Sequence, residues 1–129
     1  MSQLRIRSKV WLEVDGQPFL GDGRYRLLSA IQRNGSINAA ARDLGMSYRK
    51  VWAQLQAMEE TTPFPLMERR TGGKDGGATH LTAETVTLMK RFEEVRARVN
   101  AAADHCFHEC LKFNLLFFLV YINAFLFLP

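Results

Sequence analysis

The feature that most constrains the fold of this sequence is a pair of short helix patterns joined by a single glycine. The first pattern follows Ser36, a good N-cap, and places small and aliphatic residues at the spacing of one buried helix face. Those residues are Ile37, Ala40, Ala41 and Leu44. Gly45 can adopt the left-handed conformation that ends such a helix, and Ser47 then caps a second one. The inner face of the second helix consists of Val51, Leu55 and Met58.

Two helices joined in this way predict a helix-turn-helix, whose second helix must be supported from behind and left free in front. The preceding residues are expected to supply part of that support. Residues 4–14 alternate in part, and a turn at 15–18 with a return through 19–20 predicts N-terminal strands. A further helix is expected to end at Asn34-Gly35. Its apolar stripe consists of Tyr25, Leu27, Leu28 and Ile31.

Two extended runs that follow the second helix predict a β-hairpin. Residues 66–70 and 78–81 surround a glycine-rich tip at 71–77, a pattern typical of two short strands and a loop. A basic hairpin beside a helix-turn-helix is a wing. The fold class predicted is therefore mainly α with a small β component: a winged helix-turn-helix with N-terminal strands, a hairpin wing and a long C-terminal helix.

The long C-terminal helix begins after Thr82, its N-cap, and carries apolar residues at alternating spacings of four and three. This spacing is that of a heptad seam, and in an otherwise charged helix it predicts dimerisation. The seam consists of Leu88, Phe92, Val95, Val99 and Ala102, with Cys106 continuing the spacing. The alternative is that the stripe packs on the chain's own domain. We prefer pairing, because a helix of this length would project beyond so small a domain.

The charge distribution and the outer face of the second helix point to nucleic acid. Residues 1–58 hold nine basic and four acidic side chains, whereas residues 59–110 hold seven and nine. A positive N-terminal half favours a polyanionic partner. On the outer face, arginine can bind guanine, glutamine can bind adenine, and alanine can approach a thymine methyl group. The expected base-reading residues are Arg49, Ala53 and Gln56.

Phosphate contacts are expected from the start of the second helix and from the wing. The residues concerned are Ser47, Tyr48, Lys50, Arg69, Arg70 and Lys74. Arginine and glutamine on a solvated helix face are ordinary features. The interpretation therefore depends on the whole assembly of small-residue helix, glycine turn, acid-free face and basic hairpin. Double-stranded DNA is the expected partner.

Three segments carry a family resemblance. Residues 35–41 (Gly-Ser-Ile-Asn-Ala-Ala-Ala), residues 44–52 and the wing at 68–77 resemble the N-terminal domain of the ModE family of molybdate-responsive bacterial transcription regulators. The first half of this pattern is shared with LysR-type regulators. The resemblance spans roughly residues 4–104. It implies a winged helix-turn-helix with recognition helix 47–59, bound as a homodimer to a palindromic operator.

The sequence departs from the ModE pattern beyond the long helix. Full-length regulators of that family continue into two small β-barrel molybdate-binding domains, which nothing in this sequence is expected to form, so no cofactor is predicted. The expected organisation is a DNA-binding domain at 1–82, a dimerisation helix at 83–110 and an apolar tail at 111–129. Three interpretations of Leu111–Leu128 stand side by side: a partner-binding or dimer-extending helix, a membrane anchor, or a stretch not selected for folding. The alternative function is accordingly a protein-interaction or membrane-tethered winged-helix module.

The remaining chemistry-bearing residues predict no catalytic or metal site. No signal peptide and no export-type disulfide framework are visible, so a cytoplasmic location is expected. Four residues in one stretch come closest to a metal pattern: His105, Cys106, His108 and Cys110. Four ligands from one helix are awkward geometry without a second chain, so we prefer ordinary helix residues over a zinc or copper site. Neither a nucleophile–base pair nor paired carboxylates suggest an enzyme.

Overall fold

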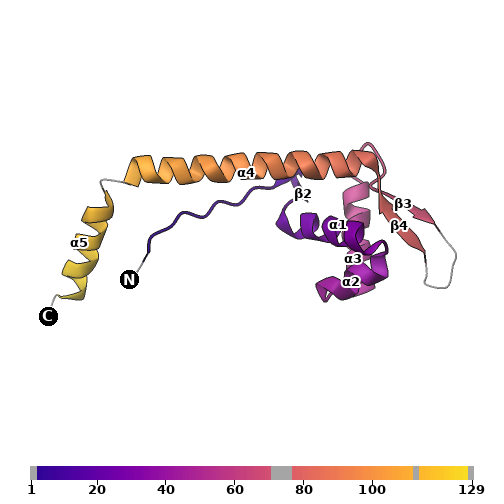
Figure 1. Ribbon diagram of the computed structural model, residues 1–129, viewed down its shortest axis with the longest axis horizontal. Helices are drawn as coiled ribbons and strands as arrows, with labels where there is room; N and C mark the ends of the chain where they lie inside the picture. Colours follow the sequence, from indigo (N-terminus) through magenta and orange to yellow (C-terminus); the bar gives the residue numbers. More distant parts are fainter. Residues whose placement is uncertain (1–2, 71–76, 112–113, 128–129) are drawn as a thin grey trace. The chain divides into compact units, whose positions relative to one another are not determined.

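The computed structural model describes residues 3–70, 77–111 and 114–127 and confirms the predicted fold class (Figure 1). Two short hairpins and five helices follow one another along the chain. In order they are β1 (Leu12–Val14), β2 (Gln17–Leu20), α1 (Asp22–Asn34), α2 (Ile37–Leu44), α3 (Tyr48–Glu59), β3 (Met67–Arg70), β4 (Ala78–Leu81), α4 (Ala83–Leu111) and α5 (Asn114–Leu126). The chain divides into two compact units, Val10–Glu93 and a second made of Met1–Lys9 with Glu94–Pro129. This division falls inside α4, between Glu93 and Glu94.

The N-terminal hairpin is shorter than the sequence pattern suggests. Strands β1 and β2 pair antiparallel, with Val14 opposite Gln17 and Leu12 opposite Leu20. Residues 3–11 form no regular structure, although the alternating pattern predicts strand from Leu4 onward. The reason is that a strand needs a partner for its ladder, and the return strand β2 ends at the residue opposite Leu12.

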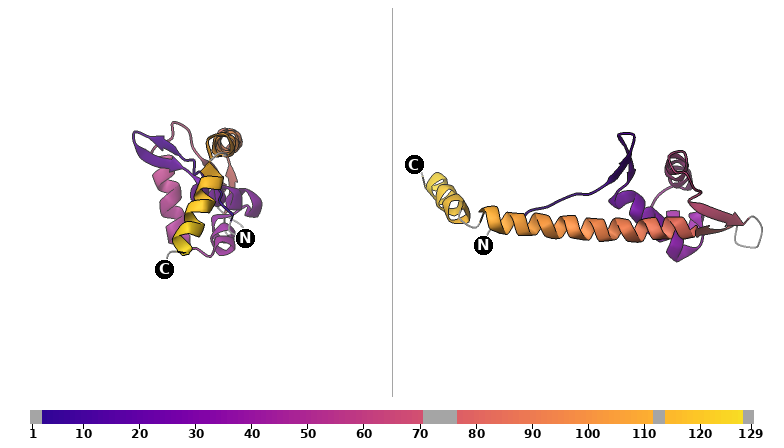
Figure 2. Two further views of the ribbon diagram at one scale, coloured as in Figure 1. Left: turned by 90° about the vertical axis from the view of Figure 1, so that its left-hand side faces the viewer. Right: turned by 90° about the horizontal axis from the view of Figure 1, so that it is seen from above.

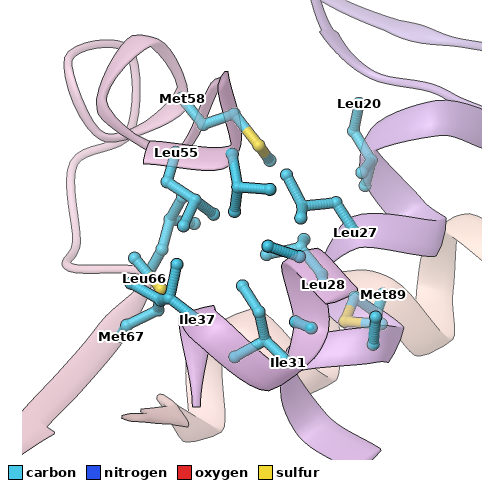
Figure 3. Close-up of a cluster of buried hydrophobic side chains, with 14 of the residues drawn as sticks. Leu20, Leu27, Leu28, Ile31, Ile37, Leu55, Met58, Leu66, Met67 and Met89 are labelled. Carbon is cyan, nitrogen blue, oxygen red and sulfur yellow. The ribbon is translucent and has the colours of Figure 1, made fainter. Parts of the chain in front are cut away.

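The core of the winged domain is built from one face of each of its helices together with β2. Figure 3 shows aliphatic side chains of α1 and α2 meeting those of α3. The fully buried members include Leu20, Leu28, Ile31, Ala40, Val51, Leu55, Met58 and Leu66. Because the three inner residues of α3 are each 0% exposed, the helix is fixed in rotation about its own axis. Its opposite face is therefore held outward.

Local capping contacts set the helix-turn-helix, as the sequence predicts. The Ser36 hydroxyl accepts a hydrogen bond from the Ala39 amide at 3.1 Å. Gly45 adopts the left-handed conformation, with φ 64° and ψ 31°. Its amide donates to the Arg42 carbonyl at 3.2 Å, and the Met46 amide donates to the Ala41 carbonyl at 2.9 Å. This pair of bonds is a Schellman motif, which ends α2 and turns the chain into α3.

A cluster of buried threonines ties the start of α4 to the base of the wing. The Thr82 hydroxyl donates to the Pro65 carbonyl at 2.8 Å, and the Thr85 hydroxyl donates to the Leu66 carbonyl at 2.9 Å. The Thr82 hydroxyl also accepts from the Thr85 amide at 3.3 Å, which makes Thr82 the predicted N-cap. Since both threonines are buried, these bonds have no water to replace them.

We predict that Thr85→Val destabilises the protein by about 1–2 kcal/mol, because it removes a buried hydrogen bond while keeping the shape of the side chain. Urea unfolding followed by circular dichroism measures the change. The matched control is Thr87→Val on the exposed side of the same helix, expected to stay within about 0.5 kcal/mol. Equal stability of the two variants would contradict a structural role for the Thr85 hydroxyl.

Helix α4 is a single continuous helix (Figure 2) whose apolar stripe changes character along its length. Phe92 is 2% exposed and lies 5.9 Å from the Tyr25 ring, centroid to centroid, and Leu88 packs partly against the same core. Val95 and Val99, by contrast, are 47% and 43% exposed. The seam predicted from Leu88 is thus shortened: its first two residues support the winged domain, and Val95, Val99 and Ala102 form the exposed part.

The apolar tail is helical in the part that the structure describes. The described side chains of α5, from residue 118 onward, are all exposed. Tyr121 and Phe125 are examples, at 68% and 80% exposed, and Phe127, just beyond the helix, is 84% exposed. Over the described residues, no helix combines the length and apolar character that crossing a membrane would require.

Candidate nucleic-acid interface

The outer face of α3 presents the residues predicted to contact bases. Arg49, Ala53 and Gln56 are all exposed, whereas the opposite face of the helix is fully buried. Among the described residues, no carboxylate is paired with the Arg49 guanidinium. A planar guanidinium and a primary amide on one open helix face can each make two hydrogen bonds to a base edge. The face thus has the chemistry of a recognition helix.

The start of α3 brings together three of the predicted phosphate contacts. Ser47, Tyr48 and Lys50 are exposed there. The Ser47 oxygen accepts from the Lys50 amide at 3.2 Å, which leaves its hydroxyl hydrogen free to donate. The unpaired amides of a helix N-terminus carry partial positive charge, which favours an anion at this end.

The wing contributes two exposed arginines. Strands β3 and β4 pair in register, with Met67 opposite Leu81 and Arg70 opposite Ala78. Arg69 and Arg70 are consecutive in β3, so their side chains leave the ribbon on opposite faces. Lys74, also predicted to contact phosphate, lies outside the described residues.

One feature of this interface is absent from the sequence-based prediction. The Arg69 guanidinium lies over the Trp52 ring, 3.8 Å from its centroid. Tyr48 stacks with the same tryptophan, at 6.3 Å between centroids and 12° between planes. The Tyr48–Trp52 contact follows from their spacing of four on a helix, but no local pattern reports the approach of Arg69 from a different element.

The only acidic residue between positions 36 and 58, Asp43, is engaged from within the domain. The Arg33 guanidinium and the Asn34 amide both donate to its carboxylate, and these hydrogen bonds lower the pKa of Asp43. The pair joins α1 to α2 at the surface, where solvent screening leaves an ion pair with little effect on stability. Its consequence here is electrostatic, because the one negative charge between positions 36 and 58 is offset by Arg33.

The described residues assemble no metal-binding cluster. Cys106 and Cys110 are exposed free thiols, and no group of three or more His, Cys, Asp or Glu side chains within the described ranges is placed to hold a metal ion. An open hollow of about 560 Å³ lies at the C-terminal end of α3. Its lining is Glu59, Thr62, Pro63, Phe64, Pro65, Met67 and Arg69. The charged side chains of this lining are one carboxylate, Glu59, and one guanidinium, Arg69.

Comparison with known proteins places these features in context. Residues 23–85 match the family described as bacterial regulatory helix-turn-helix protein, lysR family. Transcriptional regulator ModE of Haemophilus influenzae is 41% identical over 90 residues, which cover 70% of this chain and 34% of that protein. Molybdenum transport protein ModE of Azotobacter vinelandii is 35% identical over 104 residues, covering 81% and 38%.

A third relative is the DNA-binding transcriptional dual regulator ModE of Escherichia coli, 34% identical over 82 residues, which cover 64% of this chain and 31% of that protein. The chain therefore spans only about a third of the length of these curated relatives. Among solved structures, a mutant of S. aureus MepR superposes with a TM-score of 0.49 at 19% identity, covering 80% of each chain.

Proposed function

We propose that this chain, whose residues 23–85 match the LysR-type bacterial regulatory helix-turn-helix family and whose curated relatives include ModE regulators, binds a palindromic operator as a homodimer. Its helix-turn-helix is that of a ModE-like DNA-binding transcriptional regulator. In the proposed complex, α3 lies in the major groove and the wing contacts the flanking backbone. In this proposal DNA binding needs no cofactor and takes place in the cytoplasm.

The observation that carries the proposal is the contrast between the two faces of α3. Val51, Leu55 and Met58 are 0% exposed and lock the helix in place, while Arg49 and Gln56 project from the other side. Because its buried face holds the backbone of α3, the helix need not be ordered on binding, which lowers the cost of recognition. Arg49 is the expected contact to guanine, Gln56 to adenine, and Ala53 to a thymine methyl group.

Affinity that does not depend on sequence is assigned to the basic residues around α3. Lys50, Arg69 and Arg70 are exposed and carry the charge that would displace counterions from the duplex. Ser47 and Tyr48 add uncharged donors, and Lys74 would extend the basic surface of the wing. Each neutralised phosphate steepens the dependence of affinity on salt, with a slope of about −0.9 per contact.

The dimer is proposed to form through the exposed stretch of α4. Val95, Val99 and Ala102 lie on one side of the helix and are exposed in the isolated chain. A second copy of the same stripe would cover them around a two-fold axis. Two recognition helices related in this way fit half-sites about one helical turn apart, roughly 34 Å. This geometry is the reason for expecting a palindrome.

The proposal is tested by fluorescence anisotropy at two salt concentrations, with a palindromic operator of a ModE relative and a scrambled duplex of equal length. Tighter binding to the palindrome, kept at the higher salt, is the expected result. Equal and steeply salt-dependent binding to both duplexes would indicate phosphate attraction alone. Binding to neither would contradict the proposal.

A second candidate function is favoured by the exposed apolar side chains of α5. A helix surface that carries Phe118, Tyr121 and Phe125 in contact with water is unusual, because large exposed apolar patches mark interaction sites or aggregation-prone segments. In this second candidate, α5 binds a protein or a membrane surface and the winged domain is a passive support. Failure of the chain to bind either duplex would favour it over the regulator.

A further inference from the structure

Three side chains form a continuous stack between the recognition helix and the wing. Tyr48 and Trp52 lie four residues apart on α3, with ring planes only 12° from parallel. Arg69 comes from β3 and places its guanidinium carbon 3.8 Å from the Trp52 ring centroid. At this distance the cation lies well within the range of attraction to the face of an indole ring.

Trp52 is a firm support for this stack. It is half-buried and packs against the hydrophobic core of the winged domain, so its ring is held by the same residues that hold α3. The wing is a pair of four-residue strands attached to the winged domain through buried Met67 and Thr79, and the Thr79 amide donates to the Gly35 carbonyl at 2.8 Å. Arg69, opposite Thr79, is exposed, and its contact with Trp52 joins this exposed side chain of the wing to α3.

A stacked guanidinium keeps its hydrogen-bonding edge free. Arginine stacks through its flat face, while its N–H donors lie in the plane and point away from the ring. Those donors match the oxygens of a phosphate as a bidentate pair. Stacking on Trp52 thus removes freedom from the Arg69 side chain without using the donors that DNA would need.

We propose that Trp52 is a positioning residue that holds Arg69 for one phosphate of the DNA backbone, and thereby sets the wing in register with α3. This inference rests on the proposed function, since it concerns how a DNA contact is arranged. It assigns to an uncharged residue a share of the electrostatic affinity. Removal of the Trp52 ring should therefore act on salt dependence as though a positive charge had been lost.

Arg70 offers a matched comparison on the same strand. It is exposed like Arg69 and carries the same charge, but its side chain leaves the opposite face of the ribbon. Among the described residues, no aromatic ring lies against Arg70. The effects of Trp52 and Arg70 on DNA affinity should be independent, whereas those of Trp52 and Arg69 should be coupled.

The experiment measures affinity of the full chain for the palindromic duplex over a series of salt concentrations. Arg69→Gln should lower affinity about tenfold for each half-site at low salt. Because the dimer would lose two phosphate contacts, the slope of log affinity against log salt should fall by about 1.8. Trp52→Leu should reduce the slope by nearly as much, although it removes no charge. The double variant should lose no more than Arg69→Gln alone, and Trp52→Phe should restore most of the binding.

Further measurements distinguish loss of the Trp52–Arg69 contact from general loss of structure. Thermal unfolding of each variant shows whether it folds. Trp11→Leu replaces the chain's other tryptophan, which is 48% exposed and lies just before the N-terminal hairpin, and no change in slope is expected. Arg69→Lys changes only an exposed side chain and keeps its charge. Because lysine lacks the planar guanidinium face, the DNA affinity of Arg69→Lys should fall between that of the wild type and that of Arg69→Gln.

The outcomes separate this inference from the function on which it rests. Failure of the wild-type chain to bind any duplex would overturn both. Wild-type binding with an unchanged slope in Trp52→Leu, or with additive effects of Trp52→Leu and Arg69→Gln, would overturn the positioning role alone. Coupling between Trp52 and Arg70 as strong as that between Trp52 and Arg69 would also overturn the positioning role, because of the two arginines only Arg69 lies over the Trp52 ring.

Discussion

Arg49→Ala is expected to remove most of the preference for the operator while leaving binding to a scrambled duplex nearly unchanged. A bidentate arginine–guanine contact discriminates against the wrong base by about 1–3 kcal/mol, which is roughly 5- to 150-fold for each half-site. Arg49 is exposed, and α3 contacts the core through buried residues such as Val51, so the substitution should not disturb the core. Competition anisotropy with the two duplexes measures the ratio directly.

Two other substitutions make the Arg49 result specific. Lys50→Ala should weaken binding to both duplexes alike and reduce the salt slope, as expected for a phosphate contact. Arg26→Ala removes the same charge from an exposed position of α1 and should affect neither ratio nor slope strongly. If Arg49→Ala lowered affinity for both duplexes equally, Arg49 would be a backbone contact, and α3 would enter the groove in a different rotation from the one inferred.

The helix-turn-helix was predictable because local interactions specify it. Ser36 and Ser47 satisfy free amides at two helix starts, and Gly45 supplies the one left-handed residue that the turn requires. Helical spacing then assigns the inner and outer faces of α3, which is why the exposure of Arg49 and Gln56 follows from sequence alone.

Other features could not be predicted, because they depend on which distant residue becomes the partner. A heptad spacing indicates that one side of α4 is apolar, but it does not indicate which residues cover that side. The Tyr25 ring covers Phe92, whereas nothing in the described chain buries Val95. The Trp52–Arg69 stack is of the same kind, since its two residues lie on different elements. Residues 3–11 likewise form no strand, which shows that an alternating pattern does not produce a strand without a neighbouring strand to pair with.

The largest effect on DNA binding is expected from charges placed in the exposed stripe of α4. Val95→Glu combined with Val99→Glu would bring like charges together across the proposed two-fold axis and separate the dimer. A monomer holds only one half-site, and loss of the linked second contact typically costs 10²- to 10⁴-fold in affinity, so operator binding should fall by about that factor. Sedimentation equilibrium measures the assembly state and anisotropy measures the affinity.

A matched pair on the opposite side of α4 distinguishes a lost interface from altered charge. Ala97→Glu combined with Ala101→Glu has the same spacing, the same added charge and exposed positions, yet points away from the stripe. The control should remain dimeric and keep operator affinity within a few-fold. The control pair should unfold at nearly the wild-type temperature, because neither of its positions is buried within the chain. The valine pair should unfold at a lower temperature, because it loses the stabilisation that pairing gives. If the variant with both valines replaced stayed dimeric, or became a monomer that kept full operator affinity, α4 would not be the element that joins the two recognition helices. Binding to a two-fold operator would then need another interface.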